Sequence, residues 1–231
     1  MRISGLQKVT LLDYPGLVAC TVFTPGCNFR CPFCHNSGLV TDVAHADNIP
    51  IDDFFALLNK RKGLLDGVCI TGGEPLLQEG LEDFIARIKD LGFKVKLDSN
   101  GYSPAKLKKL IDDNLLDFVA MDIKNSLEKY PLTTGLATFD PQPIEESIAL
   151  LKEGRVGYEF RTTAVKEFHE AEDFRKMAKM IEGTKAYFIQ NFKDSGAVIA
   201  QGLHGFDRET LLGFRQIMLE AHIPCELRGV D

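Results

Sequence analysis

Three cysteines lie within eight residues of one another, at Cys27, Cys31 and Cys34, and His35 follows the last of them. The chain has only six cysteines, which is too sparse for a disulfide framework, so the cluster indicates metal ligation. Iron–sulfur clusters are held by cysteine thiolates, whereas zinc takes four protein ligands, for example three Cys and one His. The residues therefore predict a metal centre of one of these two kinds.

The spacing of these ligands favours iron–sulfur over zinc. Structural zinc sites usually take ligands from two separated segments, and the adjacency of Cys34 and His35 hinders both from reaching one ion. Three thiolates on a four-iron cluster leave one iron open to a substrate or cofactor. The alternative is a non-catalytic zinc-binding module, which predicts colourless protein containing one zinc.

The elements around this cluster alternate between strand and helix. Six short apolar runs rich in β-branched residues predict strands buried on both faces, at 17–23, 67–71, 94–98, 118–122, 158–163 and 186–190, with one more strand or edge segment at 223–227. Amphipathic segments predict helices at 51–61, 77–91, 104–112, 144–152, 171–181 and 208–221. Gly92 and Gly154 fall just past two of these helices, where a left-handed residue is favoured. This alternation predicts a parallel sheet with right-handed crossovers.

Polar residues follow each predicted strand. In parallel α/β folds, ligands bind beyond the carboxyl ends of the strands. Loop starts are commonly polar, but this does not explain Glu74 between Gly73 and Pro75, or Asp122 and Lys124 on either side of an isoleucine. We therefore expect one site to which all six strands contribute.

The composition excludes several classes of protein. The 231 residues are 45% hydrophobic and 26% charged, as in an ordinary globular protein, and the net charge of −6 argues against broad binding to nucleic acid or to anionic membranes. No stretch reaches the ~20 apolar residues of a membrane span, and Gln7, Lys8 and Asp13 interrupt any signal-peptide pattern. We expect one cytoplasmic domain over residues 1–231, with a cluster loop at residues 24–50.

The cysteine segment resembles the CxxxCxxC signature of radical S-adenosylmethionine (SAM) enzymes. Its continuation Cys34-His35-Asn36 is similar to the glycyl-radical-enzyme activases, and most of all to the longer form of the activating proteins of anaerobic ribonucleoside-triphosphate reductase. The supporting motifs are Asp13-Tyr14-Pro15-Gly16, Thr71-Gly72-Gly73-Glu74-Pro75, Asp98-Ser99-Asn100-Gly101 and Met121-Asp122-Ile123-Lys124.

The resemblance implies a fold, two cofactors and their contacts. The fold is a partial (β/α)6 TIM-like barrel of the radical SAM type. Cys27, Cys31 and Cys34 would hold a [4Fe–4S] cluster whose fourth iron binds SAM. The residues that match the family's cofactor-binding elements are Phe33, Gly72, Gly73, Glu74, Asp98, Ser99, Asp122, Lys124, Arg161 and Gln190.

Individual roles follow from the same resemblance. The glycines would permit close backbone approach, and Glu74 would face the SAM ammonium. Lys124 would neutralise the SAM carboxylate, and a monovalent cation would lie near Asp98 and Asp122. Gln190 stands where pyruvate formate-lyase activase has a histidine, so the ribose contact is left open.

The implied reaction uses no catalytic side chain beyond the cluster and SAM. One electron from flavodoxin or ferredoxin would cleave SAM to methionine and a 5′-deoxyadenosyl radical, which would remove a hydrogen from a glycine Cα in the partner enzyme. The implied partner is anaerobic ribonucleotide reductase. A second alternative is a radical SAM enzyme that acts on a small molecule, as the 7-carboxy-7-deazaguanine synthases do. We expect the scattered cysteines to be core residues and the isolated histidines, His169 among them, to be surface or capping residues.

Overall fold

The β-branched runs form the strands of one eight-stranded sheet in the computed structural model, which describes residues 1–230. Each predicted strand is present, within a few residues of its expected bounds. The strands are β1 (Gly5–Thr10), β2 (Ala19–Thr24), β3 (Gly67–Gly72), β4 (Lys94–Ser99), β5 (Phe118–Asp122), β6 (Gly157–Ala164), β7 (Tyr187–Asn191) and β8 (Cys225–Arg228).

The order of the strands in the sheet follows their order in the chain. All pairs from β2 to β8 are parallel, and only β1 pairs antiparallel, with β2. Within residues 1–230 no strand pairing joins β8 back to β1, so the curved sheet stays open along one side. The fold is thus the partial barrel that the resemblance implied.

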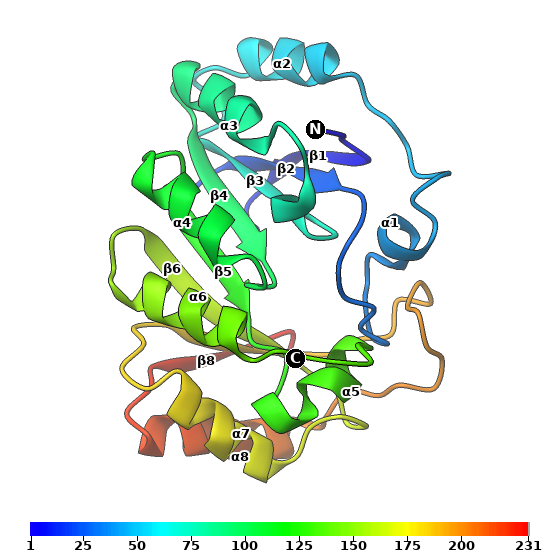
Figure 1. Cartoon of the computed structure of the whole chain (residues 1–231), viewed down its shortest axis with the longest axis vertical. Helices are drawn as coiled ribbons and strands as arrows, with labels where there is room; N and C mark the ends of the chain where they lie inside the picture. Colours follow the sequence, from blue (N-terminus) through cyan, green and yellow to red (C-terminus); the bar gives the residue numbers. More distant parts are fainter. Residues whose placement is uncertain (231) are drawn as a thin grey trace.

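The helices of nine or more residues connect the parallel strands and pack on the outside of the curved sheet (Figure 1). These helices turn an apolar stripe inward; in α3 (Leu81–Asp90), for example, Phe84, Ile85 and Ile88 are buried. The α-helices are α1 (Ser37–Thr41), α2 (Ile51–Lys60), α3 (Leu81–Asp90), α4 (Pro104–Asp112), α5 (Tyr130–Thr134), α6 (Gln142–Lys152), α7 (Ala171–Met180) and α8 (Arg208–Glu220). Two 3-10 turns, η1 (Pro75–Leu77) and η2 (Leu127–Lys129), precede α3 and α5.

One expected helix differs from the structure, and one strand was missed. The helix expected over 77–91 begins only at Leu81, because Gly80 has a left-handed φ of 71° and separates α3 from η1. Strand β1 was not expected at all, since half of its residues are exposed and its pairing with β2 depends on a hairpin whose loop is long. Gly92 and Gly154 do adopt left-handed φ values, of 91° and 71°, after their helices.

The strands are apolar on one face and polar on the other. In β4, Val95 and Leu97 belong to the hydrophobic core, while Lys96 and Asp98 alternate with them and project to the inner face of the sheet. Lys96 is nevertheless only 2% exposed. The concave side of the sheet therefore carries buried charged groups, which is the arrangement expected of a site rather than of a core. In residues 1–230, no helix combines the length and the apolar character needed to cross a membrane.

Candidate active site

A cavity of about 410 Å³ lies at the carboxyl ends of the parallel strands, between the strand ends and the loop that follows β2. Cys27, Cys31 and Cys34 all line this cavity. Nine of the ten residues predicted to contact cofactors line it too: Phe33, Gly72, Gly73, Asp98, Ser99, Asp122, Lys124, Arg161 and Gln190. The structure thus brings together segments far apart in sequence, as the strand-end argument requires.

Glycines at the end of β3 and in the loop that follows let this loop lie directly against the cluster loop. Gly73 N donates to Thr24 O and Glu74 N donates to Gly26 O, both at 2.8 Å. A Cβ on Gly73 would stand 1.9 Å from Gly26 O, and one on Gly72 would stand 2.4 Å from the backbone of Thr24. The close approach that these glycines permit is therefore between two loops of the protein itself.

Two thiols of the cluster loop, those of Cys27 and Cys31, are poor acids. Burial raises the pKa of Cys27 to about 11 and the pKa of Cys31 to about 12. Both thiols are therefore protonated at neutral pH until a metal centre displaces the protons.

The donor set fits a cluster better than a single ion. Among residues 1–230, no three His, Cys, Asp or Glu side chains converge tightly enough to hold one metal ion. His35 is engaged elsewhere, since its Nε2 lies 2.8 Å from Lys193 O and its ring stacks on Phe192. A four-iron cluster does not need this convergence, because each thiolate binds a different iron. Three thiols of one loop facing one cavity are consistent with such a cluster.

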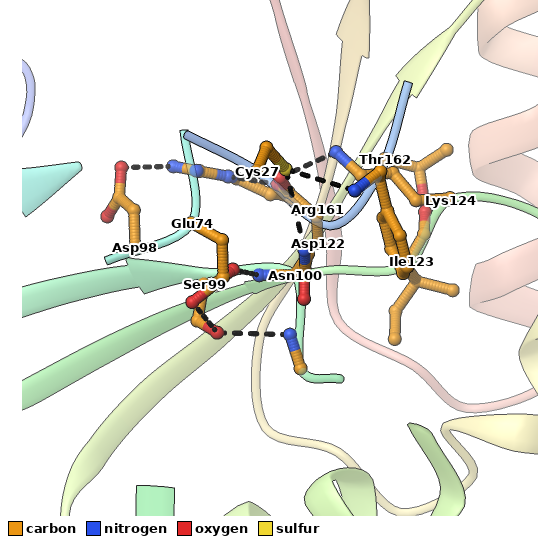
Figure 2. A network of polar contacts seen from close by, with 12 residues as sticks. Cys27, Glu74, Asp98, Ser99, Asn100, Asp122, Ile123, Lys124, Arg161 and Thr162 are labelled. Carbon is orange, nitrogen blue, oxygen red and sulfur yellow. Dashed lines mark hydrogen bonds and ion pairs between the residues drawn. The ribbon is translucent and has the colours of Figure 1, made fainter. Parts of the chain in front are cut away.

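Glu74 occupies a different position from the one expected. It does not line the cavity, and its carboxylate is buried between the loops that follow β3 and β4. It accepts hydrogen bonds from Ser99 Oγ at 3.0 Å and Asn100 N at 2.7 Å (Figure 2), and from Leu76 N at 3.0 Å. Burial raises the pKa of Glu74 to about 7, although these three donors favour the charged form. Its contacts in this structure are with the protein's own loops.

Five charged side chains form one largely buried group: Lys96 and Asp98 of β4, Asp122 of β5, Lys124 just after β5, and Arg161 of β6. Figure 2 shows Asp98, Asp122, Lys124 and Arg161. Arg161 donates from Nε to Asp122 Oδ1 at 2.6 Å and from Nη1 to Asp98 Oδ2 at 3.1 Å. Lys124 Nζ donates to Asp122 Oδ2 at 2.8 Å, and Lys96 Nζ donates to Asp98 Oδ1. Burial alone would raise the pKa of Asp122, but the charges of Arg161 and Lys124 outweigh it and hold that pKa below its ordinary value.

The predicted monovalent cation does not fit this group. All four carboxylate oxygens of Asp98 and Asp122 already accept from a cationic side chain. A cation would need those oxygens as ligands, and it would stand beside three like charges. The expectation of a cation near these two residues is therefore not supported, because each of their carboxylate oxygens already has a cationic donor.

Amide side chains that the strand-end argument did not single out hold the loops around the cavity. Asn100 Nδ2 donates to Asn28 Oδ1 at 2.8 Å, which ties the loop after β4 to the cluster loop. Asn36 Nδ2 donates to Gly72 O at 2.7 Å, at the other end of the cluster loop. The only sequence feature that points to these two asparagines is their position within the motifs named above.

His169 is buried, contrary to expectation. It is 4% exposed, and its Nε2 lies 2.9 Å from Lys124 O. Since a carbonyl oxygen only accepts, Nε2 carries the proton, and Nδ1 accepts from Val165 N at 3.2 Å. Burial lowers the pKa of His169, so the ring is neutral and holds the backbone of Lys124 in place. An isolated histidine gives no sequence signal for such a role.

A segment that follows β7 lies against the cluster loop, beside α1 in Figure 1. Ala200 N donates to Pro32 O at 2.8 Å, and Ser37 Oγ donates to Ala197 O at 2.7 Å. With the contact between His35 and Lys193, these bonds fix one side of the cluster loop.

A protein-family model for the radical SAM superfamily matches residues 21–181. The chain belongs to the radical SAM superfamily. Membership implies a [4Fe–4S] cluster and SAM as cofactors, and an enzyme of the radical SAM type. The matched range contains the cluster loop, the loop after β3 and the charged group on β4 to β6.

Relatives of this radical SAM protein include glycyl-radical enzyme activating enzymes, and this homology supports an activase role. A Methanocaldococcus jannaschii protein assigned as a glycyl-radical enzyme activating enzyme (MJ1227) is 33% identical over 200 residues, which are 84% of this chain and 81% of that protein. The pyruvate formate-lyase-activating enzyme of Clostridium pasteurianum is 31% identical over 129 residues, which are 54% of this chain and 52% of that enzyme.

Solved structures share the fold of this radical SAM protein. Streptococcus suis SuiB superposes with a TM-score of 0.69 at 15% identity, over 90% of this chain and 48% of SuiB. A domain of a pyruvate-formate lyase-activating enzyme from Bacteroides vulgatus superposes with a TM-score of 0.58 at 16% identity, over 71% of this chain and 99% of that domain.

Proposed function

We propose that this protein generates a glycyl radical on anaerobic ribonucleoside-triphosphate reductase. The observation that carries the proposal is structural. The Cys27-x3-Cys31-x2-Cys34 loop and the Gly72-Gly73-Glu74 loop, two motifs of the superfamily, are joined by backbone hydrogen bonds and share one cavity. The homology to glycyl-radical enzyme activating enzymes and the Cys34-His35-Asn36 sequence support this class of substrate.

The residues around the cavity suggest how SAM is held. Together with Lys96, the side chains of Lys124 and Arg161 outnumber the two carboxylates of the group at its floor by three to two, which suits the SAM carboxylate. Phe33, next to the cluster ligand Cys34, offers an apolar face for the adenine, and Gln190 offers an amide to the ribose. We include Gly72, Gly73 and Ser99 among the contacts to the methionine part.

Glu74 has a different part in this proposal. Its carboxylate lies between the loops that follow β3 and β4, so it fixes the glycine loop on which the SAM ammonium would rest. A full hydrogen-bond shell from its own loops leaves it an indirect role in cofactor binding.

The chain's own residues bind and orient the reactants. When bound, a reduced [4Fe–4S] cluster supplies the electron that splits SAM into methionine and a 5′-deoxyadenosyl radical. Cys27, Cys31 and Cys34 would hold the cluster, and the backbone bonds from Gly73 and Glu74 keep their loop in register with the SAM contacts. The open side of the sheet gives a glycine-bearing loop a route to the cavity. Flavodoxin or ferredoxin is the electron donor in this proposal.

The decisive experiment is electron paramagnetic resonance under anaerobic conditions. Reduced, reconstituted protein is mixed with SAM and with anaerobic ribonucleotide reductase, or with pyruvate formate-lyase as the competing partner. We expect a glycyl doublet with the reductase, and none when Cys34→Ala replaces the wild type. A doublet with pyruvate formate-lyase alone would keep the activase class and reject the named partner.

A small-molecule substrate is the second candidate. GTP 3′,8-cyclase of Campylobacter fetus is 27% identical over 202 residues, which are 82% of this chain and 59% of that enzyme. If no candidate protein acquires a radical, and 5′-deoxyadenosine accumulates only with a small molecule, the activase proposal is wrong.

A further inference from the structure

The buried charged group formed by Lys96, Asp98, Asp122, Lys124 and Arg161 contains a cation that the chain itself supplies. We propose that the Arg161 guanidinium is the permanent counter-ion of Asp98 and Asp122, so that cofactor binding and stability in this protein need no monovalent metal ion. It follows that removing this guanidinium would create a monovalent-cation site from the two carboxylates.

Strand register fixes the guanidinium between the carboxylates. Asp122 pairs with Arg161 directly across the β5–β6 ladder, so the two side chains leave the sheet side by side on the same face. Asp98 comes from β4, the neighbour of β5 on its other side. The Arg161 side chain spans the width of β5 and reaches both, with Nε on Asp122 at 2.6 Å and Nη1 on Asp98 at 3.1 Å.

Burial makes this arrangement hard to exchange for a solvated ion. The side chains of Asp98, Arg161 and Asp122 are 11%, 16% and 24% exposed. A buried carboxylate must be paired, and a planar guanidinium satisfies two carboxylates at once. A metal ion would have to displace a covalently attached partner that cannot diffuse away.

The charge balance points the same way. Lys96 and Lys124 each bind one further oxygen of the same two carboxylates, so three positive side chains face two negative ones. The excess is one positive charge, which attracts an anion and repels a second cation. With Arg161 neutralised, the excess disappears and two carboxylate oxygens lose their donor, which is the situation in which a small cation binds.

The first test compares salts on the wild-type protein. Melting temperatures of the reconstituted protein are recorded anaerobically in KCl, NaCl and tetramethylammonium chloride at equal ionic strength, without SAM or partner. We expect the three values to agree within about 1 °C. A SAM dissociation constant that agrees within about twofold across the same salts is the second readout. A saturable gain in either quantity with K⁺ or Na⁺ would overturn the proposal.

The second test removes the guanidinium. Arg161→Met should melt at least about 4 °C higher in KCl or NaCl than in tetramethylammonium chloride, because a small cation then binds only the folded state. Arg161→Lys, which keeps the charge, should lose most of this difference. Arg175→Met is the matched control, since Arg175 forms an exposed ion pair with Glu172 on α7. It should melt equally in all three salts.

The outcomes separate this proposal from the proposed function. If Arg161→Met does not fold, Arg161→Gln, which keeps a donor but no charge, serves in its place. A folded, uncharged variant that melts equally in all three salts would show that the two carboxylates do not form a cation site. The melting measurement uses neither a partner enzyme nor a reductant, so its result does not depend on which molecule receives the radical.

Discussion

Replacing the three cluster cysteines should remove the bound cluster more specifically than any other change. Replacing Cys27, Cys31 or Cys34 by Ala removes one thiolate from a set of three, so each variant should lose most of its bound iron and sulfide after anaerobic reconstitution. Cys225→Ala is the control, because Cys225 is buried in the core away from the cavity. Iron and acid-labile sulfide analysis measures the effect. Full iron content in the three variants would exclude these residues as ligands.

Glu74 gives a prediction about pH. Its folded-state pKa of about 7 lies above the ordinary value of 4.5, so its contribution to stability is fully present below pH 4.5 and is lost as the pH rises towards 7. In that window, the free energy of unfolding should fall on this account by at most about 1.4 kcal/mol per pH unit. Glu74→Gln should lack this slope in urea unfolding.

The control for this slope is Glu128→Gln, since Glu128 is an exposed carboxylate on η2. It should leave the pH dependence as in the wild type. Parallel pH profiles for wild type and Glu74→Gln would show that Glu74 does not titrate in this range.

The sequence predicted the cavity residues but not the bonds among them. Strand ends and motif spacing identify Asp98 and Asp122, because the carboxyl ends of parallel strands must meet. They do not identify Lys96, because nothing in the sequence distinguishes it from a solvent-facing lysine in a strand. They also do not identify His169, because its partner Lys124 lies 45 residues away. Glu74 was placed on SAM because its motif is shared across a superfamily, whereas its hydrogen bonds depend on the position of the next loop.

At the level of elements, the cluster loop and the loop after β3 lie so close together that Gly73 cannot be replaced by a residue with a side chain. Gly73→Ala would place Cβ 1.9 Å from Gly26 O, so the loops must separate and lose two backbone hydrogen bonds. We expect a loss of about 1–3 kcal/mol in stability, together with reduced iron content.

Gly213→Ala is the matched control for this change, because nothing lies within 4 Å of its added Cβ in α8. It should stabilise the protein by about 0.5–1 kcal/mol, since alanine favours a helix over glycine. Thermal melting and iron analysis of both variants make the comparison. Normal iron content in Gly73→Ala would contradict the proposed register of the loops.

The two differences between the expected and the observed elements have local causes. Helical periodicity continues through 77–91, so the division at Gly80 depends on a backbone conformation that periodicity does not report. Strand β1 has one partner only, and its exposed outer face gives no run of buried residues to recognise.

At the level of the whole molecule, an ion pair holds the last strand to the sheet interior. Arg228 on β8 donates from Nη1 and Nη2 to the two oxygens of Glu159 on β6, both at 2.9 Å, across the intervening β7. Its guanidinium also lies 3.5 Å from the centre of the Phe188 ring. Glu159 is 3% exposed and Arg228 is 35% exposed, so water weakens the pair only from one side.

Arg228→Met should therefore destabilise the protein by about 1–3 kcal/mol, less than a fully buried pair, because it leaves the Glu159 carboxylate without its partner. The double variant Glu159→Gln with Arg228→Met should recover part of this loss. Urea unfolding measures the free energy of unfolding of the single and the double variant. A double variant less stable than the sum of the single changes would contradict this account.

The bond from Ala200 N to Pro32 O ties the segment after β7 to the backbone between two cluster ligands. Because Cys31 and Cys34 flank Pro32, a cluster held by these two thiolates would restrain the Pro32 carbonyl and the amide that donates to it. The Ala200 amide is therefore a backbone reporter of cluster binding. Its deuterium uptake should be slower in the protein with the cluster bound than in the protein without it.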